Sequence, residues 1–171
     1  MGLDMYLNSV PKIEGLTFDQ IMLAERAIQF DGTINDSLDQ NIREKITPYI
    51  RNKGTHFTYK SLASEVGYWR KSNQIHDWFV ENVQGGEDEC NPYGVTREQL
   101  EELLSLCKEV QEDGTSEFAS KKLPTCTGFF FGDTSYGEYY WSGIALTISI
   151  LEKAINKIRE EDCYLYYKSS W

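Results

Sequence analysis

Hydrophobic and polar residues between Gly67 and Val83, GYWRKSNQIHDWFVENV, recur with the period of an α-helix. At about 100° per residue, one arc of that helix collects Tyr68, Trp69, Ile75, Phe79, Val80 and Val83. The opposite arc collects Arg70, Lys71, Gln74, Asp77 and Glu81. The pattern predicts a single amphipathic helix whose apolar side packs on the core of the protein.

Ser72 and two larger polar side chains, Asn73 and His76, interrupt the apolar arc of this helix. Asn73 and His76 are neighbours on the helix surface because they are three residues apart, and Trp69 lies one turn before Asn73. A buried polar group without a partner costs about 1–3 kcal/mol, which leaves two interpretations. Either both side chains bond to the backbone of a neighbouring loop, or Trp69, Asn73 and His76 line a pocket with Arg70 at its rim.

The segments Gly2–Asn8 and Cys163–Lys168 both alternate between apolar and polar residues, which is typical of β-strands. Neither has another obvious partner, so we expect them to lie side by side in one small antiparallel sheet. His56–Leu62 is a weaker strand candidate that would widen this sheet, since a two-stranded ribbon alone is marginally stable.

Helical patterns recur in four more segments, which are Phe18–Phe30, Ser37–Tyr49, Thr96–Gln111 and Tyr136–Glu160. Thr17 with Gln20, and Thr96 with Gln99, have the spacing of capping boxes. The stretches Asn52–Gly54, Gln84–Gly94 and Asp113–Thr127 are expected to be loops. The fold class that follows is α+β: a small antiparallel sheet joins the two terminal strands and packs on three main helices. We expect one domain over residues 1–171, with 18–53 as a helical insertion.

Composition narrows the class of protein. The 171 residues are 40% hydrophobic and 13% aromatic, enough for a real core, and the net charge of −10 disfavours direct binding to nucleic acid. We expect no membrane span, because no run of about 18 apolar residues occurs. The first residues lack the basic region of a signal peptide.

The four cysteines have no paired spacing, so we expect free thiols in the cytoplasm and no metal or cofactor.

Several longer motifs resemble a family of small uncharacterised proteins of bacteriophages, prophages and bacteria. They are MGLDMYL, EVGYWRKSNQIHDWFVENVQGG, LPTCTGFFFG, EYYW and YYKSSW, and they cover most of the chain outside about residues 16–57. The resemblance implies a phage or mobile-element setting and a product of the host cytoplasm. It carries no catalytic residues with it.

These observations favour a non-enzymatic accessory protein that inhibits a host defence system. Its partner would be a host protein or a small nucleotide-like ligand. The candidate ligand site is one cleft formed by Trp69, Asn73, His76, Phe130 and Tyr140, with Arg70 at its edge. Two alternatives stay open: a small hydrolase in which His76 is the general base, oriented by Asp4 or another acid, and a structural protein of the virion.

Overall fold

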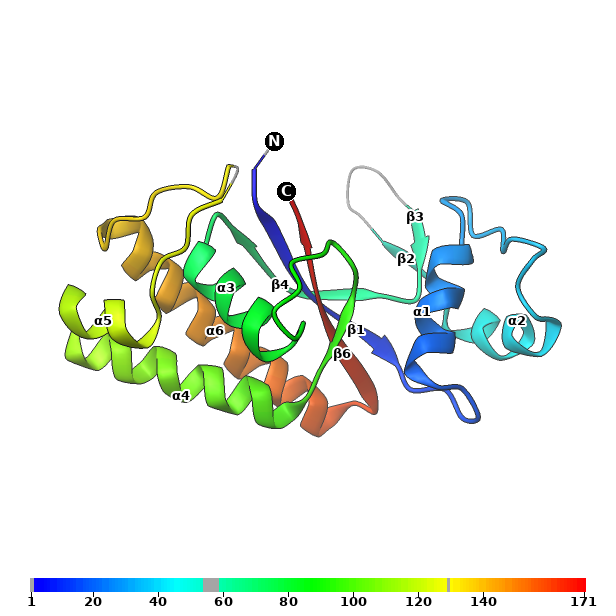
Figure 1. Ribbon diagram of the computed structural model, residues 1–171. Coiled ribbons are helices and arrows are strands. Elements are labelled where there is room, and N and C mark those ends of the chain that lie inside the picture. Colours follow the sequence, from blue (N-terminus) through cyan, green and yellow to red (C-terminus); the bar gives the residue numbers. More distant parts are fainter. Residues whose placement is uncertain (1, 54–58, 129) are drawn as a thin grey trace.

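The computed structural model describes residues 2–53, 59–128 and 130–171. An antiparallel sheet of four strands, in the order β4-β1-β6-β5, crosses the middle of the molecule, and β2 and β3 pair in a separate ribbon (Figure 1). The strands are β1 (Asp4–Pro11), β2 (Arg51–Lys53), β3 (Tyr59–Ser61), β4 (Ser64–Arg70), β5 (Tyr93–Val95) and β6 (Cys163–Ser170).

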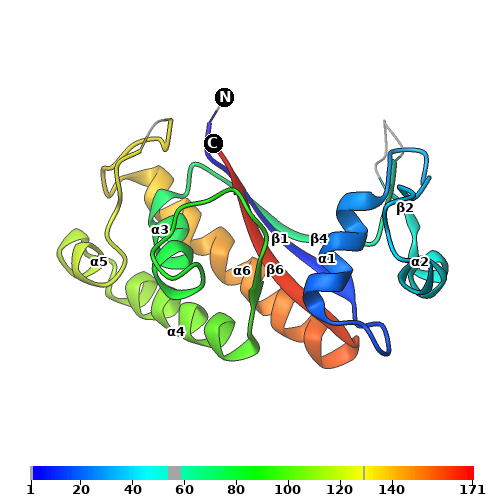
Figure 2. The ribbon, with the colours of Figure 1, turned by 45° about the vertical axis from the view of Figure 1, so that its right-hand side comes forward.

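The two terminal strands are the central pair of the sheet. β1 runs antiparallel to β6 along its full length, from Asp4 opposite Ser170 to Pro11 opposite Cys163. The N- and C-terminal ends of the described chain accordingly lie close together (Figures 1 and 2). The predicted pairing of the terminal strands is confirmed, and so is the α+β class.

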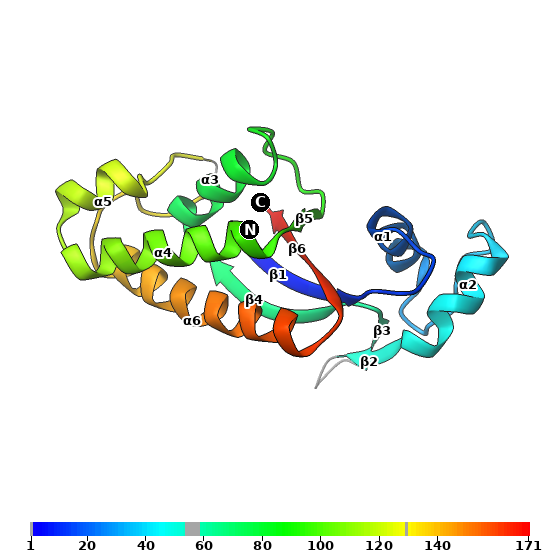
Figure 3. The same ribbon diagram turned by 90° about the horizontal axis from the view of Figure 1, so that it is seen from below.

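The helices lie on both sides of the sheet. Thr17 with Gln20 and Thr96 with Gln99 form the two predicted capping boxes, at the starts of α1 and α4. α4 and α6 pack lengthwise against each other beneath the sheet (Figure 3). The helices are α1 (Phe18–Ala27), α2 (Gln40–Ile46), the 3-10 helix Thr47–Tyr49, α3 (Asn73–Asn82), α4 (Arg97–Asp113), α5 (Ser116–Lys122) and α6 (Glu138–Glu160).

Two hydrophobic cores share the central strands. Leu3, just before β1, and Met5 and Leu7 of β1 enter the larger core, with α3, α4 and α6. Val10 of β1 and Tyr166 of β6 enter a second core, with α1 and α2. Because neighbouring residues of a strand point to opposite faces, Tyr166 faces away from the larger core that its neighbours contact. The segment 18–53 therefore packs on the opposite face of the sheet (Figure 2).

The prediction of one continuous helix from Gly67 to Val83 is wrong in its first part. Residues up to Arg70 belong to β4, which pairs with β1, and Lys71 with a φ of 58° turns the chain into α3. Trp69 is fully buried and Tyr68 reaches the surface, which is the two-residue period of a strand. Four residues are too few to separate this period from a helical arc, so the hydrogen bonds to β1 decide the conformation.

Four smaller predictions also need correction. Asn52 and Lys53 were expected in a loop but belong to β2, and the part of His56–Leu62 within the described residues pairs with β2 as β3, outside the main sheet. Residues 54–58, including His56, lie outside the described residues. The stretch after α4 contains α5, and Tyr93–Val95 adds a short fourth strand at the edge beside β6.

α6 packs closely against the sheet at Gly67 of β4. A Cβ atom built on Gly67 would lie 2.2 Å from Cγ2 of Ile150, a side chain in the larger core. We expect Gly67→Ala to lower the free energy of unfolding by about 1–3 kcal/mol, as other overpacked cores do. Urea denaturation measures this change. Gly94→Ala is the matched control, since its Cβ would meet Phe18 at an ordinary 3.4 Å. Equal stability of both variants would contradict the close approach.

The four cysteines are free thiols with different exposure. Cys90 is exposed, whereas Cys107 is fully buried, and burial raises the pKa of Cys107 to about 12. At pH 8 the thiolate fraction of Cys107 is then about one in ten thousand. We expect iodoacetamide to modify Cys90 first and to leave Cys107 unmodified until the protein unfolds, as followed by mass spectrometry. Rapid labelling of Cys107 in the folded protein would contradict this burial.

Candidate functional site

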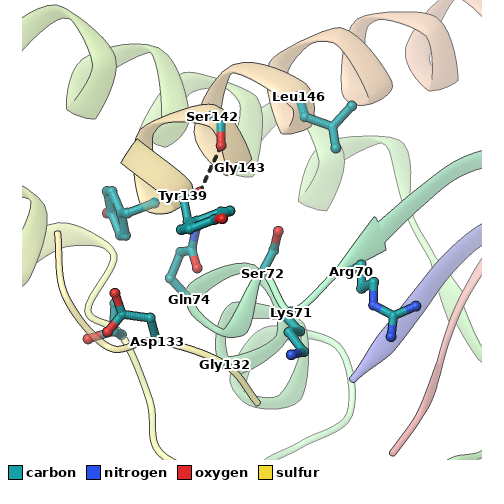
Figure 4. A pocket seen from close by; sticks show the side chains of 12 residues that line it. Arg70, Lys71, Ser72, Gln74, Gly132, Asp133, Tyr139, Ser142, Gly143 and Leu146 are labelled. Carbon is teal, nitrogen blue, oxygen red and sulfur yellow. Dashed lines mark hydrogen bonds between the residues drawn. The ribbon is translucent and has the colours of Figure 1, made fainter. Parts of the chain in front are cut away.

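A pocket of about 800 Å³ opens where the end of β4, the start of α3 and the start of α6 meet (Figure 4). Residues from the turn between β4 and α3 form one wall, and residues of the first turns of α6 form another. The lining residues are Arg70, Lys71, Ser72, Gln74, Thr125, Gly132, Asp133, Tyr139, Tyr140, Ser142, Gly143 and Leu146.

The turn between β4 and α3 is held by backbone contacts. The Lys71 amide donates a hydrogen bond of 2.8 Å to the carbonyl of Leu3, the residue just before β1. Ser72 is the N-cap of α3, but its side chain makes no capping hydrogen bond. The Ser72 carbonyl accepts from the amides of Ile75 and His76. The first amides of a helix have no partner within it, so the start of α3 presents N–H groups beside the pocket.

Gln74 is the one lining side chain whose environment is unusual for its type. It is 4% exposed, and its Nε2 atom has no hydrogen-bond partner in the part of the chain that the structure describes. A Cβ atom on Gly143 would lie 3.1 Å from this Nε2 and 3.2 Å from Ser72 Oγ. The glycine in α6 thus leaves room for both polar groups. The sequence pattern had placed Gln74 on the exposed arc, which is wrong.

Charges of both signs line the pocket. The Arg70 side chain is 59% exposed and lies 3.8 Å from Asp4, a distance at which an exposed pair contributes little. Lys71 has no ion pair among the described residues. Asp133 is the acidic group of the wall, and hydrogen bonds from Ser135 lower the pKa of its carboxyl. At neutral pH the pocket therefore carries two cations and one carboxylate.

The structure separates the six residues that the sequence grouped in one cleft. Arg70 and Tyr140 line the pocket, and the Tyr140 hydroxyl donates to the Leu123 carbonyl. Trp69 is fully buried, and its Nε1 donates to Thr147 Oγ1 at 2.9 Å. Phe130 is 48% exposed and is not a lining residue.

Asn73 joins α3 to the loop that closes the pocket. Its Nδ2 donates to the carbonyls of Phe131 and Asp133, and its Oδ1 accepts from the Cys126 amide. For Asn73 the interpretation that a neighbouring loop satisfies the side chain is therefore confirmed. Asn73 shapes the pocket wall from behind and does not line the pocket itself.

His76 lies between two polar side chains, and of its two ring nitrogens only Nδ1 has a hydrogen-bond partner among the described residues. It is 1% exposed, its Nδ1 lies 2.7 Å from the Tyr167 hydroxyl, and its Nε2 lies 3.2 Å from Asp88 Oδ1. Asp88 is thus the acid beside His76, whereas Asp4 bonds to Tyr68 on the outer face of the sheet. Within the described residues, no group of three His, Cys, Asp or Glu side chains has the arrangement of a metal site.

Lys71, Ser72 and Gln74 line the pocket but were not among the six residues of the predicted cleft. The signal that could have found them is the order Lys-Ser directly before a helix, since serine is a preferred N-cap. Starting the helix at Gly67 placed all three inside it and concealed that signal.

Comparison with protein-family models, with curated proteins and with solved structures finds no match to this chain. No helix in the described ranges has the length and apolar character needed to cross a bilayer. The assignment of the candidate site therefore rests on the geometry of this chain alone.

Proposed function

We propose that this chain is a non-enzymatic binding protein whose ligand is a small nucleotide-like molecule held in the pocket. One observation carries the proposal: aromatic side chains of α6 and cationic side chains of the β4–α3 turn line the same pocket. Tyr139 is 86% exposed and Tyr140 lies one residue further on. Arg70 and Lys71 supply the positive charge (Figure 4).

This combination suits a ligand with a planar base and an anionic group. A base stacked on an aromatic side chain gains about 1–3 kcal/mol, and cations bind phosphate oxygens through charge-assisted hydrogen bonds. The pocket volume of about 800 Å³ lies within the range of small-molecule sites. The net charge of −10 repels a polynucleotide, so it favours a small ligand over a nucleic acid strand.

The resemblance to phage and prophage proteins supplies the setting of the proposal. In the cytoplasm of an infected cell, a protein that binds a nucleotide-like signal would inhibit any host defence system that depends on that signal. Direct inhibition by binding a host protein is the other form of the same role. Native mass spectrometry of the protein purified from infected cells separates the two, because it records either a retained small molecule or a retained protein.

Calorimetric titration with ADP, ADP-ribose and adenosine tests the pocket directly. We expect both phosphate-bearing compounds to bind and adenosine to bind at least tenfold more weakly. Tyr139→Ala should weaken the binding of ADP severalfold, since it removes the exposed ring. Tyr49→Ala is the matched control, because it removes an exposed tyrosine that does not line the pocket. Absence of binding for all three compounds would refute the proposed ligand class.

A further inference from the structure

We infer that the start of α3 is a phosphate subsite, formed by the Lys71 ammonium, the Ser72 hydroxyl, the Gln74 side-chain amide and the first free backbone amides of the helix. The inference rests on the pocket of the proposed function and assigns the part of the ligand that this end holds. It names a phosphoryl group because each of these groups can donate a hydrogen bond to an anionic oxygen, and Lys71 adds a positive charge.

The helix itself provides the first element of the subsite. α3 has ten residues, and its N-cap hydroxyl makes no capping hydrogen bond. The first N–H groups of a helix point out of its end, and the helix dipole places partial positive charge there. These properties make a helix N-terminus a suitable site for a phosphate or similar anion.

The Gln74 side chain is the second and independent observation. It is more than nine-tenths buried, lines the pocket, and has an Nε2 donor without a partner among the described residues. Leaving a buried amide donor unpaired costs about 1–3 kcal/mol. A phosphate oxygen at the start of α3 would accept from this donor and remove that cost. The burial of Gln74 is thereby explained by what it binds.

Ser72 and Lys71 complete the donor set. Ser72 is 7% exposed, and its hydroxyl has no hydrogen bond to the described chain. No carboxylate of the described residues lies within 4 Å of the Lys71 ammonium, so its charge is available to an anion. In Figure 4 the side chains of Ser72 and Gln74 lie between the start of α3 and Gly143 of α6.

The Asp133 carboxylate repels an anion in the same pocket, so its removal should change the affinity for phosphate in a known direction. The carboxylate is held on the pocket wall by Ser135 and stays ionised at neutral pH. We expect Asp133→Asn to strengthen the binding of phosphate and of ADP by a factor of about two to five. The effect should shrink as salt is raised, because salt screens charges at the surface.

The decisive experiment measures binding of inorganic phosphate, ADP and adenosine to Gln74→Met and to a matched control. The control is Gln84→Met, which removes another buried amide without a partner, just beyond the other end of α3. We expect Gln74→Met to weaken the binding of phosphate and of ADP at least tenfold and to leave adenosine unchanged. Gln84→Met should bind all three as the unmodified protein does.

The outcomes separate the subsite from the proposed function. Equal affinity of ADP for Gln74→Met and the unmodified protein overturns the subsite and leaves the nucleotide pocket standing. Phosphate and ADP binding with equal affinity, both lost in Gln74→Met, keep the subsite and refute the nucleotide-like ligand. If Gln74→Met does not fold, Ser72→Ala and Lys71→Gln replace it, with Lys153→Gln of α6 as the control for the lost charge. Unchanged phosphate affinity in both replacements overturns the subsite.

Discussion

Replacing His76 by alanine is expected to lower the free energy of unfolding by about 3–5 kcal/mol. The imidazole is buried, and its removal leaves the hydroxyl of the equally buried Tyr167 without its partner. An orphaned buried group costs about 1–3 kcal/mol. The cavity beside Phe131, whose ring lies 5.1 Å from the imidazole, adds to that cost. Urea denaturation followed by tryptophan fluorescence measures the change.

The same variant tests whether His76 belongs to the ligand site. Below its unfolding transition, His76→Ala should bind ADP as tightly as the unmodified protein, because the imidazole does not line the pocket. Glu81→Ala changes an exposed position of α3 and is the control for a substitution in this helix. It should change neither the free energy of unfolding nor the affinity for ADP. Loss of binding together with unchanged stability would instead place His76 in the site, as the sequence hypothesis has it.

Asn73→Ala should lower the free energy of unfolding by about 2–4 kcal/mol and loosen one wall of the pocket. The alanine removes three hydrogen bonds, two to the carbonyls of Phe131 and Asp133 and one from the Cys126 amide. Each such bond contributes about 0.5–1.5 kcal/mol. They connect α3 to the loop that carries Gly132 and Asp133, so the loop loses three of its hydrogen bonds to the helix and keeps the bond from Cys126 Sγ to the backbone carbonyl of residue 73.

Hydrogen exchange at the Cys126 amide reports this loosening directly, because Asn73 Oδ1 is its acceptor. We expect exchange at Cys126 to accelerate in Asn73→Ala. Asn82→Ala is the matched control. It removes another asparagine side chain of the same helix, and that side chain makes one hydrogen bond, to the Trp78 carbonyl. If the Cys126 amide exchanges at the same rate in both variants, the loop is held by other contacts.

Sequence alone predicted the elements that are long enough to repeat their hydrophobic period several times. The helix from Glu138 to Glu160 spans more than six turns, and β1 and β6 are eight residues long each. Periodicity over such lengths admits one conformation. The two capping boxes were found because their signal is local: a threonine and a glutamine three residues apart bond to each other's backbone.

The part around Lys71 could not be predicted in the same way. Tyr68 and Trp69 fit a helix as well as a strand, and the choice depends on β1, more than sixty residues earlier in the chain. Placing the start of α3 wrongly then turned Gln74 toward solvent, although the structure buries it. The pocket is formed by residues from three separate segments, and a single sequence contains no signal for that meeting.

Only part of the candidate site was predicted from the sequence, because two different signals were used to choose its residues. Arg70 and Tyr140 were chosen because cationic and aromatic residues suit a nucleotide-like ligand, and these two do line the pocket. Asn73 and His76 were chosen because they interrupt an apolar arc. Such an interruption indicates only that a partner exists, and here the partners are a loop and the Tyr167 hydroxyl.

The pairing of β1 with β6 at the centre of the sheet has a consequence for how the chain folds. Asp4 and Ser170 are opposite each other, so the central pair closes a loop that contains nearly the whole sequence. Closing a long loop costs entropy before its contacts form, and folds rich in such distant contacts fold slowly. On a translating ribosome the sheet cannot be completed until Ser170 has emerged. Both cores depend on these strands, so neither can reach its final packing during synthesis of the preceding residues.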